Sequence, residues 1–425
     1  MSGSTRSPAG VTVAVVGAGG RGISHARRIR RAEGRVVAVA EPDDDRRERL
    51  SADHKIATGS QFTDWRALAE RPRCADAVLV TTQDADHAEP CQRFAELGYH
   101  ILCEKPMAPT EAEAAGIAAA VQRAGVLFAV CHSLRYTTYT QAVKDLLASG
   151  RIGDVVTVQH LEPVGWWHFA HSYVRGSWRR EDLSSSLLMA KCCHDLDWLG
   201  YVIGARPARV SSFGRLTHFR PEHRPVGAAN RCLECAVEPD CPYSALRLYR
   251  SCLGNSRWEH WPLGAVTGTP TEQSLHKELA EGPYGRCVYD CDNDVVDHQV
   301  VALDYDNGVT ATHTVTAFTE MAQRKTRIFG TQGCIDGDGH QLTVHDFRTG
   351  PSAAVETVEL RKDQRPDAVS AHDDGDQSLV TAFLTAVANN DPTPILSGPD
   401  ESVDSHRVVW AAERARRSGS VVTLT

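Results

Sequence analysis

The chain has 425 residues, a length that predicts two or three domains. Its content of 42% apolar and 24% charged residues is typical of a globular protein, and its net charge of −8 argues against a nucleic-acid partner. No apolar run is long enough to cross a membrane. Residues 1–9 lack the apolar segment of a signal peptide and are expected to form a disordered tail, so we expect a cytoplasmic protein.

The first structured stretch combines an apolar strand with a glycine-rich turn. Residues 11–16 are apolar and rich in valine, which is typical of a buried parallel strand. The strand leads into a G-x-G-x-x-G motif. In this motif Gly17 permits the tight turn, Gly19 lets the backbone approach a pyrophosphate, and Gly22 allows the next helix to pack closely on the strand. The motif predicts a dinucleotide site, and a plain β-α-β unit without a cofactor is the alternative.

A carboxylate follows the second expected strand at the spacing that this interpretation requires. After a helix the strand covers residues 35–40, and it ends in Glu41. A carboxylate there binds the ribose hydroxyls of a dinucleotide and repels a 2′-phosphate, so the sequence favours NAD over NADP. Arg46 and Arg47 lie nearby and could weaken this preference.

Strands and helices go on alternating through the first third of the chain. This pattern predicts a doubly wound parallel α/β domain at residues 10–135, and ligands of such sheets bind beyond the carboxyl ends of the strands. The further strands are expected at 75–81, 99–103 and 126–131. The polar residues that follow strand ends, and so would face the cofactor, are Thr81, His87, Glu104, Lys105 and His132.

The remaining residues, 136–425, are expected to form a second, α+β domain. Several strands follow one another without helices between them, which predicts a large, mostly antiparallel sheet. These strands are expected at 155–161, 295–303, 309–316, 324–329, 334–336 and 341–346, and helices at 187–203, 377–388 and 402–418. An aromatic and basic run at 166–180 has no clean period and is expected to be an irregular loop. Residues 221–294 are rich in Pro, Gly and Cys and are expected to form an insertion without a core of its own.

The order of these motifs resembles that of the Gfo/Idh/MocA oxidoreductases. The likeness rests on the glycine motif at 17–22, Glu-Lys-Pro at 104–106, the stretch at 132–136 and His-Asp-Leu-Asp at 194–197, and it covers the chain except for the insertion. It implies an NAD(P)-binding Rossmann domain joined to an open-faced sheet domain. It also implies action on sugars or polyols and a homodimer or homotetramer assembled through the sheet.

The resemblance also implies the catalytic groups. Lys105 would hydrogen-bond a substrate hydroxyl and help to move its proton, and His194 would transfer a proton near neutral pH. Inositol dehydrogenase-like members carry an aspartate four residues before this histidine, where the present chain has Ala190. Lys191, Asp195 and Asp197 are the candidate replacements, and Asp197 can share a helix face with His194.

The aromatic and basic run at 166–180 is suited to a carbohydrate. Tryptophan and tyrosine faces stack on sugar rings, and arginine makes paired hydrogen bonds to anionic groups. The candidate substrate contacts are Tyr173, Arg175, Trp178 and Arg179. The alternative is that this segment packs on the second domain or lies in a dimer interface.

Several of the 13 cysteines call for an explanation, because disulfides are rare in the cytosol. Cys232 and Cys235 have C-x-x-C spacing, and Cys241 follows six residues later, which predicts a structural zinc site. Cys287 is the preferred fourth ligand, ahead of Cys252 and Cys291. Free, half-buried thiols are the alternative, and a redox pair is a weaker one.

Together these observations predict a cytoplasmic, NAD-dependent enzyme that transfers a hydride between nicotinamide and a ring carbon of a sugar, glycoside or cyclitol. The first alternative is a redox glycosidase, which oxidises its substrate transiently, eliminates the leaving group, adds water and reduces the product again. The second is a non-catalytic protein that senses dinucleotides. Net formation of NADH distinguishes the main prediction from the first alternative.

Overall fold

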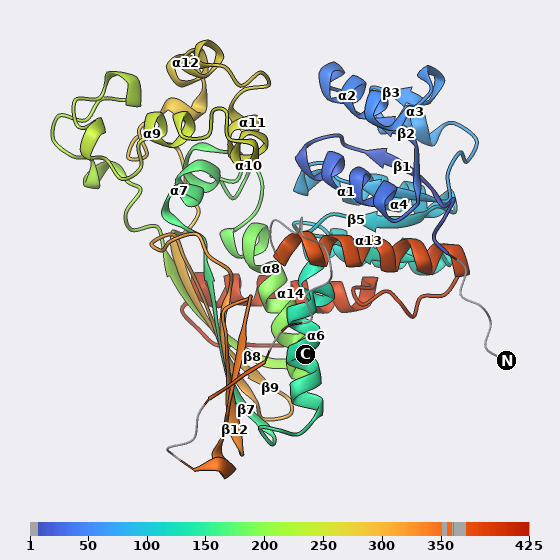
Figure 1. The fold of residues 1–425 in the computed structure, drawn as a ribbon, viewed down its shortest axis with the longest axis vertical. Coiled ribbons are helices and arrows are strands. Elements are labelled where there is room, and N and C mark those ends of the chain that lie inside the picture. The colour runs from blue at the N-terminus through green and yellow to red at the C-terminus, as the bar shows by residue number, and fades with distance from the viewer. Residues whose placement is uncertain (1–6, 351–354, 359, 361–370, 425) are drawn as a thin grey trace.

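The computed structural model describes residues 7–350, 355–358, 360 and 371–424, so most of the predicted tail at 1–9 lies outside the described residues. Two sheets organise these residues, one of six strands and one of nine (Figure 1). The predicted combination of a parallel α/β domain with a second domain built on a mostly antiparallel sheet is confirmed.

The N-terminal domain is a Rossmann-like sheet with helices on both faces. Its strands pair in parallel in the order β3-β2-β1-β4-β5-β6. The strands are β1 (Thr12–Val16), β2 (Arg35–Ala40), β3 (Gln61–Phe62), β4 (Ala77–Val80), β5 (His100–Cys103) and β6 (Phe128–Val130). The helices are α1 (Gly20–Arg31), α2 (Asp44–His54), α3 (Trp65–Ala69), α4 (Ala88–Glu96) and α5 (Glu111–Ala124).

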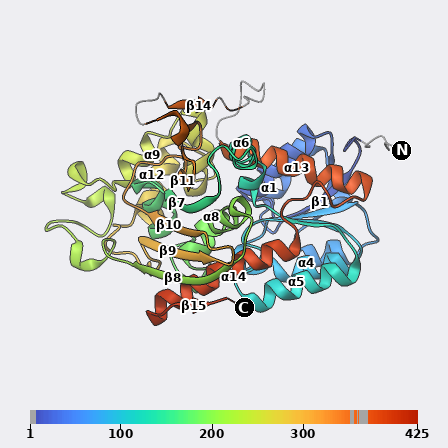
Figure 2. The same cartoon turned by 90° about the horizontal axis from the view of Figure 1, so that it is seen from below.

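A helix from the far end of the chain completes this domain. Helix α13 (Ala371–Asn389) lies beside α1 on one face of the parallel sheet, and α4 and α5 cover the other face (Figure 2). Leu379, Phe383 and Leu384 are fully buried in one core with Val13 and Ile29. Helix α13 follows residue 135, where the sequence predicts the second domain, yet its apolar face is buried in the core of the first domain.

The C-terminal domain is built on the nine-stranded sheet, in the order β14-β13-β12-β11-β7-β10-β9-β8-β15. Only β7 and β10 pair in parallel. The strands are β7 (Val155–Pro163), β8 (Pro207–Arg215), β9 (His298–Tyr305), β10 (Thr310–Thr316), β11 (Lys325–Gly330), β12 (Gly333–Gly337), β13 (Leu342–Asp346), β14 (Glu356–Val358) and β15 (Val422–Thr423). Its main helices are α6 (Thr138–Ala148), α8 (Leu187–Ile203) and α14 (Pro399–Ser418).

The helices of this domain cover one face of its sheet and leave the other open (Figure 1). The open face carries apolar side chains in neighbouring strands. Phe213 is 70% exposed and its register partner Val300 is 39% exposed. Among the described residues, none of the helices is both long and apolar enough to cross a bilayer.

The expected irregular loop at 166–180 is wrong in its first half. Helix α7 (Trp166–Phe169) runs directly into a π-helical segment, Ala170–Arg175. Phe169, Tyr173 and Val174 are buried in the core of the second domain. The four-residue spacing of Phe169 and Tyr173 places them on one helical face, and this burial stabilises a helix in a stretch that has no regular polar pattern.

The insertion between β8 and β9 has a small core, which corrects the expectation that it has none. Its helices are α9 (Ala245–Arg250), α10 (Ser256–Trp258), α11 (Gly264–Val266) and α12 (Glu272–Glu281). Tyr249, Leu263, Leu275 and Leu279 are buried against one another. At about 25 cal/mol per Å² of apolar surface, a core this small adds limited stability to so long a segment.

Candidate active site

The glycine motif forms the turn from β1 into α1, and its three glycines meet different constraints. A Cβ atom on Gly17, whose φ is +91°, would lie 2.5 Å from the Thr81 carbonyl oxygen, and one on Gly22 would lie 2.1 Å from the Gly17 carbonyl oxygen. These two positions therefore require glycine for packing. A Cβ on Gly19 would meet nothing within 4 Å. The surface at Gly19, beside the N-terminus of α1, is open to a phosphate group, so this turn fits a dinucleotide.

Glu41 follows β2 and braces the same turn. Its carboxylate accepts a 2.6 Å hydrogen bond from the Ala18 backbone amide and a 3.0 Å bond from the Asp43 amide. The guanidinium of Arg47 is also held locally, because it donates to the Glu41 carbonyl oxygen at 2.7 Å and pairs with Asp44. The carboxylate thus lies against the glycine turn, and Arg47 already has two partners.

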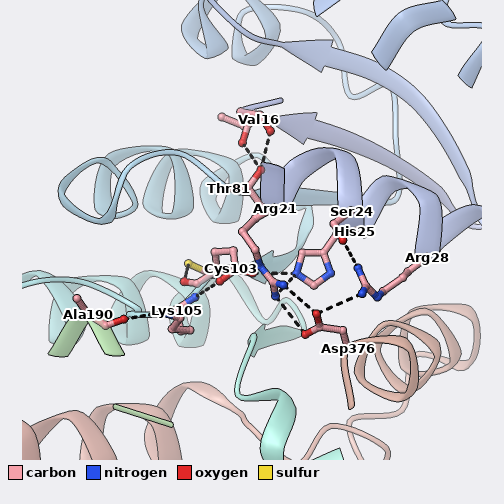
Figure 3. A network of polar contacts seen from close by, with 12 residues as sticks. Val16, Arg21, Ser24, His25, Arg28, Thr81, Cys103, Lys105, Ala190 and Asp376 are labelled. Carbon is pink, nitrogen blue, oxygen red and sulfur yellow. Dashed lines mark hydrogen bonds and ion pairs between the residues drawn. The ribbon is translucent and has the colours of Figure 1, made fainter. Parts of the chain in front are cut away.

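Thr81 and His87 support the turns around this site. The Thr81 hydroxyl contacts the Val16 and Gly17 carbonyl oxygens at 3.1 and 2.6 Å (Figure 3). His87 is buried, and its Nδ1 donates to the Pro106 carbonyl oxygen at 2.7 Å. Thr81 therefore holds the glycine turn, and His87 holds the turn that follows Lys105.

Glu104 is held in a buried polar cluster. Its Oε1 accepts from Arg21 Nε at 2.5 Å and contacts His25 Nε2 at 2.8 Å, and its Oε2 accepts from the Lys105 amide at 2.9 Å. Burial raises the pKa of Glu104, but the charge of Arg21 and the hydrogen bond with His25 outweigh it and hold this pKa well below the usual range. Glu104 is therefore a carboxylate that positions the backbone of Lys105 rather than its ammonium.

Arg21 extends this cluster to the C-terminal part of the chain. Its guanidinium makes two hydrogen bonds to Asp376 on α13, at 2.8 and 3.1 Å (Figure 3). Arg28 lies 3.5 Å from the same carboxylate. The sequence prediction missed the pair of Arg21 and Asp376 because 355 residues separate them. Arg21 occupies a variable position of the G-x-G-x-x-G motif, and the motif assigns no role to that position.

Lys105 lies between the two domains. Its Nζ donates a 2.6 Å hydrogen bond to the carbonyl oxygen of Ala190 on α8 (Figure 3). His194 lies one helical turn further along α8 and is 7% exposed. Because residues four apart share a helix face, α8 presents both the carbonyl that holds Lys105 and the imidazole of His194 on the same side.

His132 lies beside His194, and His406 lies beside His132. The His132 ring centre is 5.6 Å from that of His194 and 5.4 Å from that of His406 on α14. Burial lowers the pKa of both His132 and His406, the latter to about 3, so both rings are neutral at pH 7. His406 was not predicted, since no local motif marks it. A neutral, buried ring, that of His132, thus lies next to the predicted catalytic histidine.

The prediction of Asp197 as a catalytic group is corrected by its contacts. Its side chain is fully buried, and its two oxygens accept from Arg135 Nε and Nη2 at 2.8 and 2.7 Å. A carboxylate that is enclosed and engaged in this way joins α8 to the 3₁₀ turn at Ser133–Tyr136, which follows β6. Lys191 is also paired, with Nζ 3.1 Å from Glu162, which in turn lies 2.9 Å from Arg324.

Two of the four predicted substrate contacts are buried, and a third is paired with a carboxylate. Tyr173 is 4% exposed within the core of the second domain. Arg175 is 1% exposed and donates to the carbonyl oxygens of Arg286 and Tyr243 at 2.7 and 2.9 Å. Arg179 pairs with Asp292 at 2.9 Å. The prediction is corrected for Tyr173 and Arg175, because burial leaves them no surface to offer. Trp178 is partly buried against the same core.

An aromatic cavity lies elsewhere on this domain. It has a volume of about 860 Å³ and lies between α7 and the insertion. Its lining includes Trp166, Trp167, Arg247, Trp258 and Met321, and neither Lys105 nor His194. The exposed aromatic surface is therefore separate from the groups that the sequence predicts to be catalytic.

The four predicted zinc ligands line the same cavity, and the zinc site stays a prediction. Cys232, Cys235, Cys241 and Cys287 all line one cavity of about 20 Å³ in the insertion. All 13 cysteines of the chain are free of disulfides. Cys252 lies in the separate core of the insertion, and Cys291 Sγ contacts the Cys287 carbonyl oxygen at 3.2 Å. Among the described residues, no three of these four sulfur atoms lie within 4.8 Å of one another, so the cavity does not hold them in the arrangement of a closed zinc site.

The parallel sheet, its open glycine turn and the lysine at the domain junction define a dinucleotide-binding oxidoreductase. An oxidoreductase family with an NAD-binding Rossmann fold matches residues 11–132, and the C-terminal α/β domain of the same family matches residues 144–424. The chain belongs to this family, the Gfo/Idh/MocA oxidoreductases, as its motifs predict.

Comparison with individual proteins agrees with this assignment. The chain is 30% identical over 43% of its length to 1,5-anhydro-D-fructose reductase from Ensifer adhaerens, covering 53% of that protein. It is 26% identical over 49% of its length to 2,7-anhydro-N-acetylneuraminate hydratase from Escherichia coli, again covering 53%. The chain thus spans about half the length of these curated relatives. A structure of levoglucosan dehydrogenase with NADH and levoglucosan has a TM-score of 0.69 and 16% identity, over 97% of this chain and 99% of that one.

Proposed function

We propose that the protein is an NAD-dependent oxidoreductase of a sugar or anhydro-sugar, with hydride transfer at a ring carbon that bears a hydroxyl. The observation that carries the proposal is the position of Lys105, which lies beyond the carboxyl end of β5. Its Nζ is 2.6 Å from the Ala190 carbonyl oxygen of α8. Ligands of doubly wound sheets bind at this edge. The names of the anhydro-sugar relatives favour the substrate class.

Gly17, Gly19 and Gly22 would hold the pyrophosphate, and Glu41 the ribose hydroxyls. When bound, the nicotinamide supplies a hydride acceptor or donor. The Lys105 ammonium would donate a hydrogen bond to the substrate oxygen and so stabilise negative charge on it. An imidazole nitrogen of His194 would accept the hydroxyl proton during oxidation and return it during reduction.

NAD fits better than NADP, because the Glu41 carboxylate lies against the glycine turn and Arg47 is engaged by the Glu41 carbonyl oxygen and Asp44. A 2′-phosphate would meet a carboxylate there rather than an available arginine. The open sheet face with Phe213 and Val300 supports a homodimer or homotetramer, since exposed apolar patches mark association sites. A cytoplasmic location remains part of this proposal, and the 13 free cysteines support it, since thiols stay reduced in the cytosol.

The test is a panel of free sugars, anhydro-sugars and glycosides incubated separately with NAD and NADP. NADH absorbance is followed together with the disappearance of substrate. The proposal expects NADH formation with at least one member of the panel, and loss of this activity in Lys105→Met. Turnover with NADP alone would contradict the cofactor assignment.

A hydratase or redox glycosidase is the second candidate, and the Lys105–Ala190 contact favours it. Lys105 is held by a carbonyl oxygen where the inositol dehydrogenase-like members have an aspartate, so the lysine has no full counter-charge on α8. The hydratase named among the relatives supports the same possibility. This candidate expects hydration or cleavage of an anhydro-sugar or glycoside at constant NADH, in the panel described above.

A further inference from the structure

The cavity of about 860 Å³ between α7 and the insertion has no part in the mechanism proposed above. It is lined by residues of α7, of the segment that contains α9, of α10 and of the loop between β10 and β11. Figure 1 shows α7 below the insertion helices α9 and α10. Sites for small organic ligands have volumes of about 300–1,000 Å³, so the cavity has the size of such a site.

Trp166 is fixed in this lining although its ring is open to solvent. Its backbone amide donates to the Thr319 carbonyl oxygen at 2.9 Å, and its indole N–H donates to the Pro242 carbonyl oxygen at 3.1 Å. Gly165, whose φ is +89°, packs so closely on Met321 that a Cβ atom there would lie 2.6 Å from the Met321 Cβ atom. Trp166 is nevertheless 40% exposed. Since its N–H is already bonded, the indole presents apolar surface from a fixed position.

Two further indoles enlarge this apolar surface. Trp167 and Trp258 both line the cavity, and their ring centres lie 5.5 Å apart with the ring planes at 89°. In an edge-to-face pair of this kind each ring helps to fix the other. Met321, which is 39% exposed, extends the same lining. Exposed apolar surface of this extent marks a binding site, because leaving it in contact with water is costly.

A cation and a carboxylate complete the lining. Arg247 on α9 is exposed, and its Nη2 donates to the carbonyl oxygens of Glu238 and Pro239. Among the described residues no carboxylate pairs with it, so its other nitrogens can donate to a ligand. Glu320, in the loop between β10 and β11, is exposed and lies 3.4 Å from Lys325. One cation and one carboxylate offset each other, so this lining does not favour a strongly charged ligand.

Indole surface with hydrogen-bonding groups beside it fits a carbohydrate. A pyranose ring packs its C–H groups on an indole face, and its hydroxyls bond to a guanidinium or a carboxylate at the ring edge. A purely apolar ligand would cover the two charged groups without giving them partners. A cavity that takes a drug-sized ligand has room for more than one sugar ring.

The cavity and the catalytic groups lie on either side of one strand end. Glu162, near the end of β7, lies 3.1 Å from Lys191 on α8, and Lys191 is next to Ala190, whose carbonyl oxygen holds Lys105. Trp166 follows Glu162 by four residues, so the Cα atoms of these two residues are at most about 14 Å apart. A ligand with several rings can therefore be shared between the two places.

We propose that the cavity binds the non-reacting rings of a glycoside or oligosaccharide, while the ring to be oxidised lies at Lys105 and His194. Trp166 supplies the main stacking surface, and Arg247 and Glu320 bind hydroxyl groups. The placement of the reacting ring rests on the proposed function. Binding in the cavity forms no covalent bond and requires no NAD, so it can be measured apart from turnover.

The first experiment measures this binding with the full-length protein in the absence of NAD. The protein is applied to an array of immobilised neutral and acidic glycans, and calorimetry compares the best neutral trisaccharide with its single-ring sugar. We expect the trisaccharide to bind at least about tenfold more tightly, and Trp166→Ala to lose this advantage. Phe347→Ala is the matched control, since Phe347 is 59% exposed and lies outside the cavity, and it should bind like the original protein. The absence of binding to neutral glycans, or unchanged binding in Trp166→Ala, would overturn the proposal.

A second variant covers the possibility that Trp166→Ala fails to fold. Arg247 is exposed and its side chain contacts only two backbone carbonyl oxygens, so Arg247→Gln should fold and should bind the trisaccharide at least about fivefold more weakly. In turnover assays both variants should lower the ratio of kcat/KM for a glycoside to that for its single-ring sugar. An unchanged ratio in both would contradict the proposal. Tight binding that depends on Trp166, without any reaction of NAD, would support the cavity and contradict only the proposed reaction.

Discussion

The Lys105 ammonium donates a 2.6 Å hydrogen bond to the Ala190 carbonyl oxygen, and this contact joins the end of β5 to helix α8. It also holds Lys105 one helical turn from His194. A carbonyl oxygen carries only a partial charge, so the ammonium keeps most of its ability to stabilise a substrate oxyanion. The two domains therefore have to be in place together for Lys105 to be positioned.

Lys105→Met tests this role. We expect turnover to fall about 10²- to 10⁴-fold, the usual contribution of a group that assists proton transfer. The affinity for NAD, measured by calorimetry, should stay the same because the glycine turn is unaltered. Lys277→Met is the control, since Lys277 is exposed on α12, and it should keep full activity. Undiminished turnover in Lys105→Met would remove the lysine from the mechanism.

Substitutions in the glycine motif can test its role in packing and its role in cofactor binding separately. In Gly22→Ala the new Cβ would lie 2.1 Å from the Gly17 carbonyl oxygen, so we expect a loss of about 1–3 kcal/mol in unfolding free energy. In Gly19→Ala the Cβ meets nothing within 4 Å and φ is −67°, so the fold should be unchanged. The affinity of Gly19→Ala for NAD should fall at least about tenfold.

Urea unfolding and NAD titration of both variants provide the measurement. Gly20→Ala is the control, because Gly20 begins α1 and its Cβ also meets nothing within 4 Å. If Gly19→Ala bound NAD as tightly as the original protein, the pyrophosphate would have to bind away from this turn.

The parallel domain could be predicted because its signals are local. The valine-rich strand, the glycine turn and Glu41 lie within about 30 residues of one another, and each follows from backbone geometry. Helix α13 could not be assigned in this way, because its place is decided by Leu384 and Asp376 meeting partners more than 300 residues away. Its own sequence shows only that it is a helix.

The site shows the same division. Local motifs predicted the position of Lys105 and the grouping of four cysteines around one cavity. The burial of Tyr173 and Arg175 could not be predicted, because it depends on how the π-helical segment packs. The sequence of an aromatic run looks the same whether its arginine binds a ligand or faces the core. Arg175 faces the core, as its contact with Cys232 shows, and Cys232 lies 57 residues further along the chain.

His406 gives a prediction for the dependence of stability on pH. Burial lowers its pKa to about 3, and its contacts require the neutral ring, since Nε2 accepts from the Met107 amide at 3.0 Å and Nδ1 donates to the Ser402 carbonyl oxygen at 2.7 Å. The unfolded chain takes up this proton near pH 6.5. The contribution of His406 is thus complete above about pH 6.5 and is lost as the pH falls towards about 3.

Urea unfolding between pH 7.5 and 4.5 tests this prediction. Each such histidine adds at most about 1.4 kcal/mol per pH unit to the decline in stability below pH 6.5. His406→Gln removes one titrating group, so its stability should be lower at pH 7.5 and should decline less steeply. Equal slopes for the two proteins would show that His406 is protonated in the folded state.

Arg175→Met distinguishes a residue that supports the fold from a substrate contact. Methionine keeps much of the length of the side chain and removes the hydrogen bonds to the Arg286 and Tyr243 carbonyl oxygens. We expect a loss of about 1–3 kcal/mol in unfolding free energy, because buried carbonyl oxygens lose their donors. The KM for the sugar should be unchanged, because Arg175 is 1% exposed. Arg179→Met is the matched control for stability, since it breaks a partly exposed pair with Asp292 and a 3.3 Å bond to the Gly176 carbonyl oxygen, and it should cost less than about 1 kcal/mol. A raised KM in Arg175→Met with unchanged stability would instead return this arginine to the substrate site.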